Sequence, residues 1–276
     1  MARTYALMGI VNVTPDSFSD GGSFLSPQAA ISHALKLVLE GAEILDVGGE
    51  STRPGADPVP AALELERVMP VLEGLAAVQV AARISIDTSK ADVARAAVGA
   101  GAGIVNDVTA LRGDPEMAGV VAESGVDCCL MHMLGEPRTM QQDPRYEDVV
   151  DDVRAFLEER LRFAVDHGIA EERIMLDPGI GFGKTTAHNL ALLERLGEIA
   201  QLGRPIVIGT SRKGFIGRLI ADASGAARAA GVTHRLGGTI ATNVMALERG
   251  ASIFRVHDVG PVGDALAVAA ATLGAQ

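Results

Sequence analysis

The stretch Ile44-Leu-Asp-Val-Gly-Gly-Glu-Ser-Thr-Arg-Pro54 is a short apolar run that ends in a carboxylate, two glycines and a cluster of polar side chains. The run from Ile44 to Val47 has the composition of a buried parallel strand. Such a strand needs neither Asp46 nor the polar residues that follow Val47. We therefore expect chemistry just beyond the carboxyl end of this strand.

The same pattern, a run of β-forming residues that ends in a functional group, returns along the whole chain. The predicted strands lie near residues 6–12, 43–47, 83–87, 103–107, 127–132, 173–177, 205–209 and 252–256. Segments of helical period lie between them, among them residues 27–40, 61–77, 90–100, 146–167 and 239–249. Regular alternation of strand and helix is typical of a parallel sheet.

A strand count of about eight favours an α/β fold in which a single domain, residues 1–276, closes into a (β/α)8 TIM barrel. An open doubly wound sheet is the alternative, and spacing alone does not decide between them. Either sheet would bind ligands at the carboxyl ends of its strands. The groups expected there are Asn12, Asp46, Asp87, Asn106, His132, Asp177, Lys213, Arg255 and His257.

Composition limits the possible partners. The chain has 276 residues, a formal net charge of −11 and no Trp, which argues against a nucleic-acid surface. No leader-like segment and no run of membrane-spanning length is present, so we expect a cytoplasmic protein without a membrane partner. Cys128 and Cys129 are neighbours on a predicted strand and point to opposite faces, so we expect two buried thiols in a reducing compartment.

Basic side chains are expected at the same strand ends, although the protein is acidic. They are Arg53, Lys213, Arg255 and His257, and their convergence predicts an anion site. Ser211 follows the seventh strand and suits the N-cap of the next helix. A ligand role for Ser211 is compatible with that one, because a helix amino terminus also attracts carboxylates and phosphates.

Three acidic residues, Asp46, Asp87 and Asp177, end or interrupt separate predicted strands. Any one of them could simply tie down a loop, but three aimed at one cavity are harder to explain structurally, since unpaired buried charges are costly. With Asn106 they suit a ligand that carries N–H donors along one edge, such as a guanidine-like heterocycle. His132 reads equally well as a hydrogen-bonded histidine at a strand end, and we assign it no function.

The glycine-rich stretch Asp177-Pro-Gly-Ile-Gly-Phe-Gly-Lys-Thr185 does not have the spacing of a nucleotide-binding phosphate loop. Its alternating glycines would instead let backbone pass close to a flat ligand, with Phe182 as one wall. Two other polar stretches read as lids. One is residues 13–26, which ends in a Ser26 N-cap, and the other is Gly48 to Pro58 around Thr52 and Arg53.

Taken together, these stretches resemble the dihydropteroate synthase family, which sulfonamides target, over almost the whole chain. The matching motifs are Met8-Gly-Ile-Val-Asn-Val-Thr-Pro-Asp-Ser-Phe-Ser-Asp-Gly-Gly22, Asp46-Val-Gly-Gly-Glu-Ser-Thr-Arg-Pro-Gly55, Ser85-Ile-Asp-Thr88, Asn106-Asp107, Asp177-Pro-Gly-Ile-Gly-Phe-Gly-Lys184, Ser211-Arg-Lys213 and Arg255-Val-His-Asp258. The resemblance implies a (β/α)8 barrel that condenses 6-hydroxymethyl-7,8-dihydropterin diphosphate with 4-aminobenzoate, and a homodimer.

The resemblance also implies roles for single residues. The pterin would be held by Asp87, Asn106, Asp177 and Lys213, and the residue patterns above add Asp46 and Phe182 as substrate contacts. The diphosphate would be held by Arg255, His257 and Asn12, the last as the protein ligand of Mg²⁺. The 4-aminobenzoate pocket would be shaped by Phe18, Thr52, Arg53 and Ser211, and the catalytic group would be Asp87, Lys213, Arg255 and His257.

Two other functions compete with this one. A pterin-binding methyltransferase module would share the barrel and the acids but should lack Ser211-Arg-Lys213 and Arg255-Val-His257. A non-enzymatic pterin-binding paralogue should lack the loop residues Asp16, Phe18, Thr52 and Arg53, all of which are present. The Ala-rich stretch 221–233 departs from the family pattern and leaves a helix boundary open.

Overall fold

Eight parallel strands close into a barrel in the order β1-β2-β3-β4-β5-β6-β7-β8, with β1 pairing both β2 and β8. The structure is a computed structural model that describes residues 5–14, 26–227 and 229–274. The strands are β1 (Ala6–Asn12), β2 (Ile44–Gly48), β3 (Arg83–Asp87), β4 (Ile104–Asp107), β5 (Asp127–Met131), β6 (Ile174–Asp177), β7 (Ile206–Ile208) and β8 (Ala251–Val256). Closure excludes the open sheet and confirms the predicted (β/α)8 fold.

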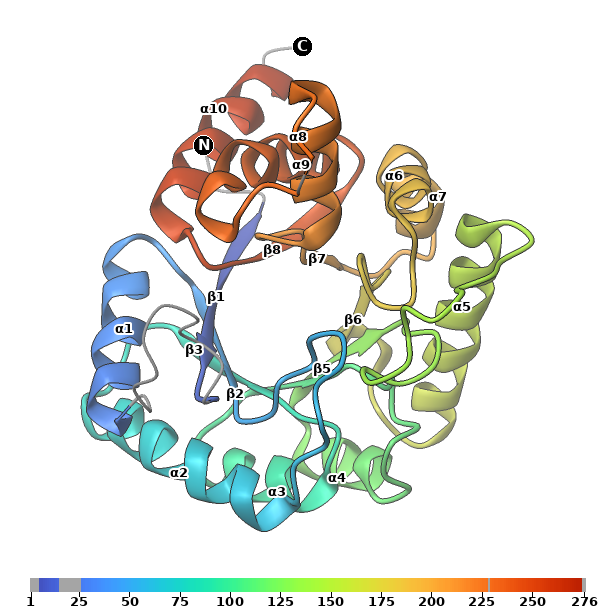
Figure 1. Cartoon of the computed structure of the whole chain (residues 1–276). Helices are drawn as coiled ribbons and strands as arrows, with labels where there is room; N and C mark the ends of the chain where they lie inside the picture. The colour runs from blue at the N-terminus through green and yellow to red at the C-terminus, as the bar shows by residue number, and fades with distance from the viewer. Residues whose placement is uncertain (1–4, 15–25, 228, 275–276) are drawn as a thin grey trace.

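The α-helices form a ring outside the strands, as the view in Figure 1 shows. They are α1 (Pro27–Leu39), α2 (Ala61–Ala77), α3 (Ala91–Gly99), α4 (Met117–Ser124), α5 (Val149–Asp166), α6 (Thr186–Glu194), α7 (Leu196–Ala200), α8 (Gly214–Ser224), α9 (Leu236–Glu248) and α10 (Val259–Leu273). The described residues also form the short 3₁₀ helices η2 (Glu171–Arg173) and η3 (Val232–His234). Among the described helices, none is long and apolar enough to cross a membrane.

Capping side chains set several helix boundaries. Ser26 caps α1 as predicted, since its hydroxyl accepts a hydrogen bond from the Ala29 N–H. Helix α5 begins at Val149 rather than near residue 146, because the Asp148 carboxylate accepts from two backbone N–H groups of the first turn. In the stretch 221–233, α8 ends at Ser224 and Gly225 takes the left-handed conformation that commonly closes a helix.

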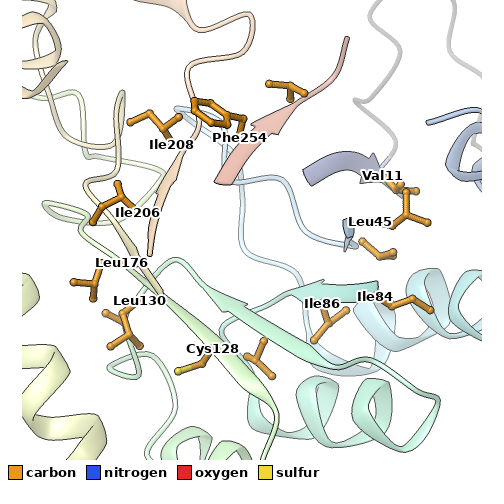
Figure 2. Close-up of a cluster of buried hydrophobic side chains, with 14 of the residues drawn as sticks. Val11, Leu45, Ile84, Ile86, Cys128, Leu130, Leu176, Ile206, Ile208 and Phe254 are labelled. Carbon is orange, nitrogen blue, oxygen red and sulfur yellow. The ribbon is translucent and has the colours of Figure 1, made fainter. Parts of the chain in front are cut away.

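Apolar side chains form one layer outside the sheet and another inside it. The outer layer packs strands against helices and includes Val11, Leu45, Ile86 and Phe254, some of the side chains drawn in Figure 2. The inner layer is a separate cluster of Met8, Ile44, Ile104, Cys129, Met175, Val207 and Ile253. Cys128 belongs to the outer layer and Cys129 to the inner one, so the two free thiols face opposite sides as predicted.

Strand alternation aims polar groups into the barrel just above the inner apolar layer. On four strands a polar residue follows an inner-layer residue by two positions and so shares its face. The pairs are Ile44 with Asp46, Ile104 with Asn106, Met175 with Asp177 and Ile253 with Arg255. Because all strands are parallel, these groups meet at one end, which we call the barrel mouth.

Candidate active site

Arg255 joins two acids across the barrel mouth. Its Nε donates to Asp46 Oδ2 at 2.6 Å, and one Nη donates to Asp87 Oδ2 at 2.6 Å. Asp46 also accepts hydrogen bonds from Ser85 Oγ at 2.6 Å and from Asn106 Nδ2 at 3.1 Å. The fully buried Asp46 therefore orients its neighbours, and two of the three acids, Asp46 and Asp87, are paired with a cation within the protein.

Burial perturbs the titration of these groups. It raises the pKa of Asp87, an effect that Arg255 opposes. It also raises the pKa of Asp177, opposed by Lys213 and by the Gly179 N–H, which donates to Asp177 at 2.6 Å. Burial lowers the pKa of Arg255, but Asp46 and Asp87 outweigh that effect and raise it, so the guanidinium stays charged.

Lys213 and Phe182 form one wall of the mouth. The Lys213 ammonium lies 4.5 Å from the centre of the Phe182 ring and donates to the carbonyl oxygen of Ile180. Burial lowers the pKa of Lys213 to about 8, although Asp177 acts in the opposite direction. A flat ligand at this wall would meet an aromatic face, a cation and the Asp177 carboxylate, which matches the expected heterocycle.

The glycines of the β6–α6 loop serve internal packing. Gly179 and Gly183 have φ of +67° and +63°, and a Cβ on them would lie 1.9 Å from the His132 carbonyl oxygen and 2.5 Å from that of Leu134. For this pair the structure gives a reason other than the predicted close approach to a ligand. The close approach is to the backbone that follows β5.

Lys184, near the end of the same loop, is only 1% exposed. Its Nζ donates to the Phe182 carbonyl oxygen at 3.0 Å and lies 2.9 Å from His132 Nδ1. Burial lowers the pKa of His132 to about 2, and lowers that of Lys184 well below its usual value. His132 is thus a hydrogen-bonded strand-end histidine. No role was assigned to Lys184 from the sequence. Its position directly after three alternating glycines was the only sequence signal for it.

Ser211 lies beside His257 at the ends of β7 and β8. Its Oγ accepts from the His257 backbone N–H at 3.2 Å and lies 3.0 Å from His257 Nδ1. The prediction that Ser211 caps a helix is wrong. The chain turns at Arg212, whose φ is +58°, and Lys213 stands at the N-cap position of α8. Burial, with Arg212 and Arg255, lowers the pKa of His257 to about 3, so the imidazole is neutral at pH 7.

Loop residues complete the described part of the mouth. Arg53 lies close enough to His257 that its charge helps lower the pKa of that imidazole, and the half-buried Thr52 precedes it in the same loop. Asn12 ends β1 and shares the inward face of Met8. Phe18, with Asp16 and Ser19 of the first expected lid, lies outside the described residues.

One end of the barrel holds all these groups, as expected for acids and bases that share a ligand. Asp177 on β6 and Arg255 on β8 are separated by β7 in the barrel, and the Arg255 charge acts on Asp177, so the two residues share the mouth. A surface hollow lined by Leu75, Arg83 and Gly101 lies at the opposite end, beside the amino ends of β3 and β4. It is remote from the polar groups.

Comparison with known proteins gives a consistent result. The model of the family "Pterin binding enzyme" matches residues 8–257. A dihydropteroate synthase of Escherichia coli is 46% identical over 270 residues, covering 98% of this chain and 92% of that protein. The Xanthomonas albilineans dihydropteroate synthase with 4-aminobenzoic acid has a TM-score of 0.89 at 48% identity, covering 98% and 93%. The Yersinia pestis dihydropteroate synthase with a sulfonamide drug has a TM-score of 0.91 at 41% identity, covering 99% and 95%.

Proposed function

Since the chain belongs to the pterin-binding enzymes and, within them, to the dihydropteroate synthases, we propose how its barrel mouth performs their reaction. The reaction condenses 6-hydroxymethyl-7,8-dihydropterin diphosphate with 4-aminobenzoate and yields 7,8-dihydropteroate and diphosphate in folate biosynthesis. The observation that carries this function is the match to dihydropteroate synthases over 98% of the chain.

The pterin occupies the acidic side of the mouth in this proposal. Asp177 and Asp87 accept hydrogen bonds from the N–H edge of the heterocycle, and Asn106 pairs with it through its amide. Lys213 donates to a ring heteroatom while Phe182 lies against the ring face, in line with the 4.5 Å contact between these two side chains. Asp46 acts one step back, since its oxygens already hold Asn106 and Arg255.

The diphosphate lies beside Arg255 and His257. The two acids engage only part of the guanidinium, which has further N–H groups for a phosphate oxygen. His257 is neutral in the free protein and contributes a ring N–H donor rather than a charge. We assign the metal site to Asn12.

A Mg²⁺ ion fits the donors available at this place. The described residues include no group of three or more His, Cys, Asp or Glu arranged to hold a metal. Asn12 offers one neutral amide oxygen on the inward face of β1. Mg²⁺ keeps several waters and takes other oxygens from substrate phosphates, so a single protein ligand suffices. When bound, the ion would neutralise charge on the departing diphosphate.

The reaction proceeds by a largely dissociative displacement. Arg255 and His257 stabilise the charge that grows on the diphosphate as the bond from the exocyclic carbon to oxygen breaks. The resulting positive charge delocalises into the electron-rich dihydropterin, whose edge Asp87 and Asp177 hold. The amine of 4-aminobenzoate then supplies its electron pair to that carbon. The arylammonium that forms is acidic and gives its proton to water, so no strong general base is needed.

The second substrate lies between the β2–α2 loop and the start of α8. Thr52, Arg53, Ser211 and Phe18 shape its pocket. Its carboxylate faces the amino end of α8, where the helix dipole and Arg53 both favour negative charge. We expect sulfonamides, which bind the Yersinia pestis relative, to compete with 4-aminobenzoate here.

We also propose that the active protein is one domain over residues 1–276, a homodimer and cytoplasmic. The single closed barrel supports the first point. The resemblance to a family of homodimers supports the second, and the buried free thiols, typical of a reducing compartment, support the third. Sedimentation of the purified chain tests its assembly.

Diphosphate release tests the function directly. Purified protein with Mg²⁺, the pterin diphosphate and 4-aminobenzoate should release diphosphate and form dihydropteroate, and omission of either substrate should abolish the product. A pterin-binding methyltransferase module or an inactive paralogue would bind the pterin without that release. Tight pterin binding with no diphosphate released would therefore refute the enzyme.

A further inference from the structure

Three charged residues hold the base of the β2–α2 loop, residues 49–60. Lys90 Nζ donates to Glu64 Oε2 at 2.6 Å and to Glu50 Oε2. The other Glu50 oxygen, Oε1, accepts from the Val59 N–H at 3.0 Å. Glu50 therefore ties the two ends of the loop together and fastens both to Lys90. We call Glu50, Glu64 and Lys90 the base cluster.

The base cluster lies among the elements that carry the pterin site. Lys90 occupies the N-cap position of α3, three residues after Asp87 at the end of β3. Glu64 lies in the first turn of α2 and contributes to the raised pKa of Asp87. Arg67, one turn further along α2, donates to the Gly49 carbonyl oxygen at 2.7 Å. Thus the loop is fixed to the rigid barrel at its base.

The two carboxylates of the base cluster differ in burial and in role. Glu64 forms a buried ion pair, and Glu50 holds the loop. Glu64 is fully buried and Oε1 has no hydrogen-bond partner within the described chain, so this carboxylate needs the Lys90 cation for stability. Burial lowers the pKa of Lys90, but Glu50 and Glu64 outweigh it and raise the pKa. Glu50 is about one-fifth exposed, so its carboxylate depends less on the Lys90 cation than the fully buried Glu64 does. The bond of Glu50 to Val59 serves the loop instead.

The loop tip carries the residues assigned to the second substrate. Thr52 and Arg53 lie two and three residues after Glu50, and a turn is closed by the Ala56 N–H donating to the Arg53 carbonyl oxygen at 3.0 Å. The Gly55 N–H donates to the Pro137 carbonyl oxygen at 3.1 Å. The Gly55 contact supports the tip, and the base cluster fixes the two ends of the loop segment that carries Thr52 and Arg53.

We propose that Glu50 and Lys90 are positioning residues for 4-aminobenzoate: by closing the loop at its base they hold Thr52 and Arg53 at the barrel mouth. The proposal rests on the proposed function, because it assigns a task to one of the two substrate pockets. The proposal predicts different effects on the two substrates. The pterin contacts come from strand ends, whereas the loop carries only residues assigned to 4-aminobenzoate.

The direct test compares Glu50→Ala and Glu50→Gln with the unaltered protein. Glu50→Ala removes both bonds, and the KM for 4-aminobenzoate should rise by about tenfold or more, while the Kd of the pterin diphosphate changes by less than about twofold. Glu50→Gln keeps an oxygen for the Val59 N–H and should give a smaller rise. Hydrogen exchange at Val59 should lose protection in Glu50→Ala and retain part of it in Glu50→Gln.

Arg95→Met is the matched control. Arg95 lies on α3 and, like Lys90, joins two carboxylates, those of Asp92 and Glu116, but this ion pair is exposed and does not contact the loop. Arg95→Met should leave both substrate constants and the Val59 amide unchanged. Lys90→Met strands the buried Glu64 charge, so Lys90→Met/Glu64→Leu, which removes both, is the variant of choice. It should reproduce the rise in the KM for 4-aminobenzoate. Because Glu64 also acts on Asp87, the comparison between the two substrates is made with Glu50→Ala, which retains Glu64.

Each remaining outcome is decisive. An equal rise in both constants, or lost Val59 protection with an unchanged 4-aminobenzoate KM, would overturn the positioning role. If the unaltered protein released no diphosphate, the proposed function would fail. Val59 exchange and direct 4-aminobenzoate binding to the pterin-loaded protein would then still decide whether Glu50 holds the loop for that ligand.

Discussion

Arg255 shows how one residue can serve both the fold and the reaction. Arg255→Ala would leave Asp46 and Asp87 buried without their cation, and the free energy of unfolding should fall by about 3–5 kcal/mol. Turnover should also collapse, because the diphosphate loses its charged partner. Urea unfolding at about pH 8 and diphosphate release measure the two effects.

A second substitution separates the two roles of Arg255. In Arg255→Ala/Asp46→Asn one stranded charge is gone, so part of the stability should return while turnover stays low. Recovery of turnover in step with stability would show that Arg255 acts only through the fold. A loss of turnover without any loss of stability would contradict the ion pairs seen here.

Lys213 gives a prediction in pH. Its pKa lies at about 8, so the Lys213 side chain is mostly a charged ammonium at about pH 7. The ammonium loses its proton as the pH rises through about 8. The Kd of the pterin diphosphate should rise across that interval, since a neutral amine is the weaker donor. Titration calorimetry from about pH 7 to about pH 9 measures it.

Substitution isolates the Lys213 contribution from the titration of the ligand. Lys213→Ala should weaken binding by about 2 kcal/mol at about pH 7 and flatten the profile near pH 8. The control Lys36→Ala removes an exposed lysine of α1 that pairs with Glu40. It should change neither the Kd of the pterin diphosphate at about pH 7 nor its dependence on pH. An unchanged Kd in Lys213→Ala would remove this residue from the pterin site.

Single residues were predictable where strand alternation alone determines their direction. Asn106 and Asp177 follow from their position two residues after an inner-layer residue. The ion pair of Arg255 with Asp46 was not predictable, because the residues are 209 positions apart and meet only when the barrel closes. Such a cross-barrel bond depends on geometry that local sequence does not contain.

Among the connecting elements, the β6–α6 loop has glycines with different tasks. A Cβ at Gly179 would lie 1.9 Å from the His132 carbonyl oxygen, so Gly179→Ala must displace backbone. We expect it to destabilise the protein by about 3 kcal/mol or more and to weaken pterin binding, because Asp177 accepts from the Gly179 N–H. Urea unfolding and pterin calorimetry measure both.

Gly225 provides the comparison at the same backbone angle. Its φ is +68°, close to the +67° of Gly179, but a Cβ there would meet no atom within 4 Å. Gly225→Ala should therefore cost only about 1 kcal/mol, the strain of a left-handed alanine. Equal losses in the two variants would show that φ alone, rather than contact with His132, requires Gly179.

Helix ends were predictable where a side chain caps them and not where the backbone turns unexpectedly. Ser26 followed by Pro27 identified the start of α1. Ser211 looked equally suitable, yet the positive φ of Arg212 moves the start of α8 to Gly214. An arginine gives no local sign of that conformation, so the hydroxyl was assigned to a helix when it lies against His257.

For the whole molecule, the decisive feature is closure. The order of elements predicted a parallel sheet, but only the pairing of β1 with β8 makes it a barrel with no free edge. Closure encloses the inner apolar layer beneath the mouth and encloses Cys129 with it. We therefore expect access to the interior to require cooperative opening of the barrel.

Cys129 reports the opening of the barrel, and Cys128 reports separation of the helices from the strands. Cys128 and Cys129 are fully buried, and burial raises the pKa of Cys128 to about 12 and that of Cys129 well above its usual value. At about pH 8 a thiol-disulfide reagent should thus label neither in the native protein and both after unfolding. The pterin diphosphate should slow labelling in proportion to 1 + [ligand]/Kd, since only the folded mouth binds it. Labelling that is fast without denaturant and indifferent to the ligand would show that the barrel opens locally, against the cooperative closure inferred from β1 and β8.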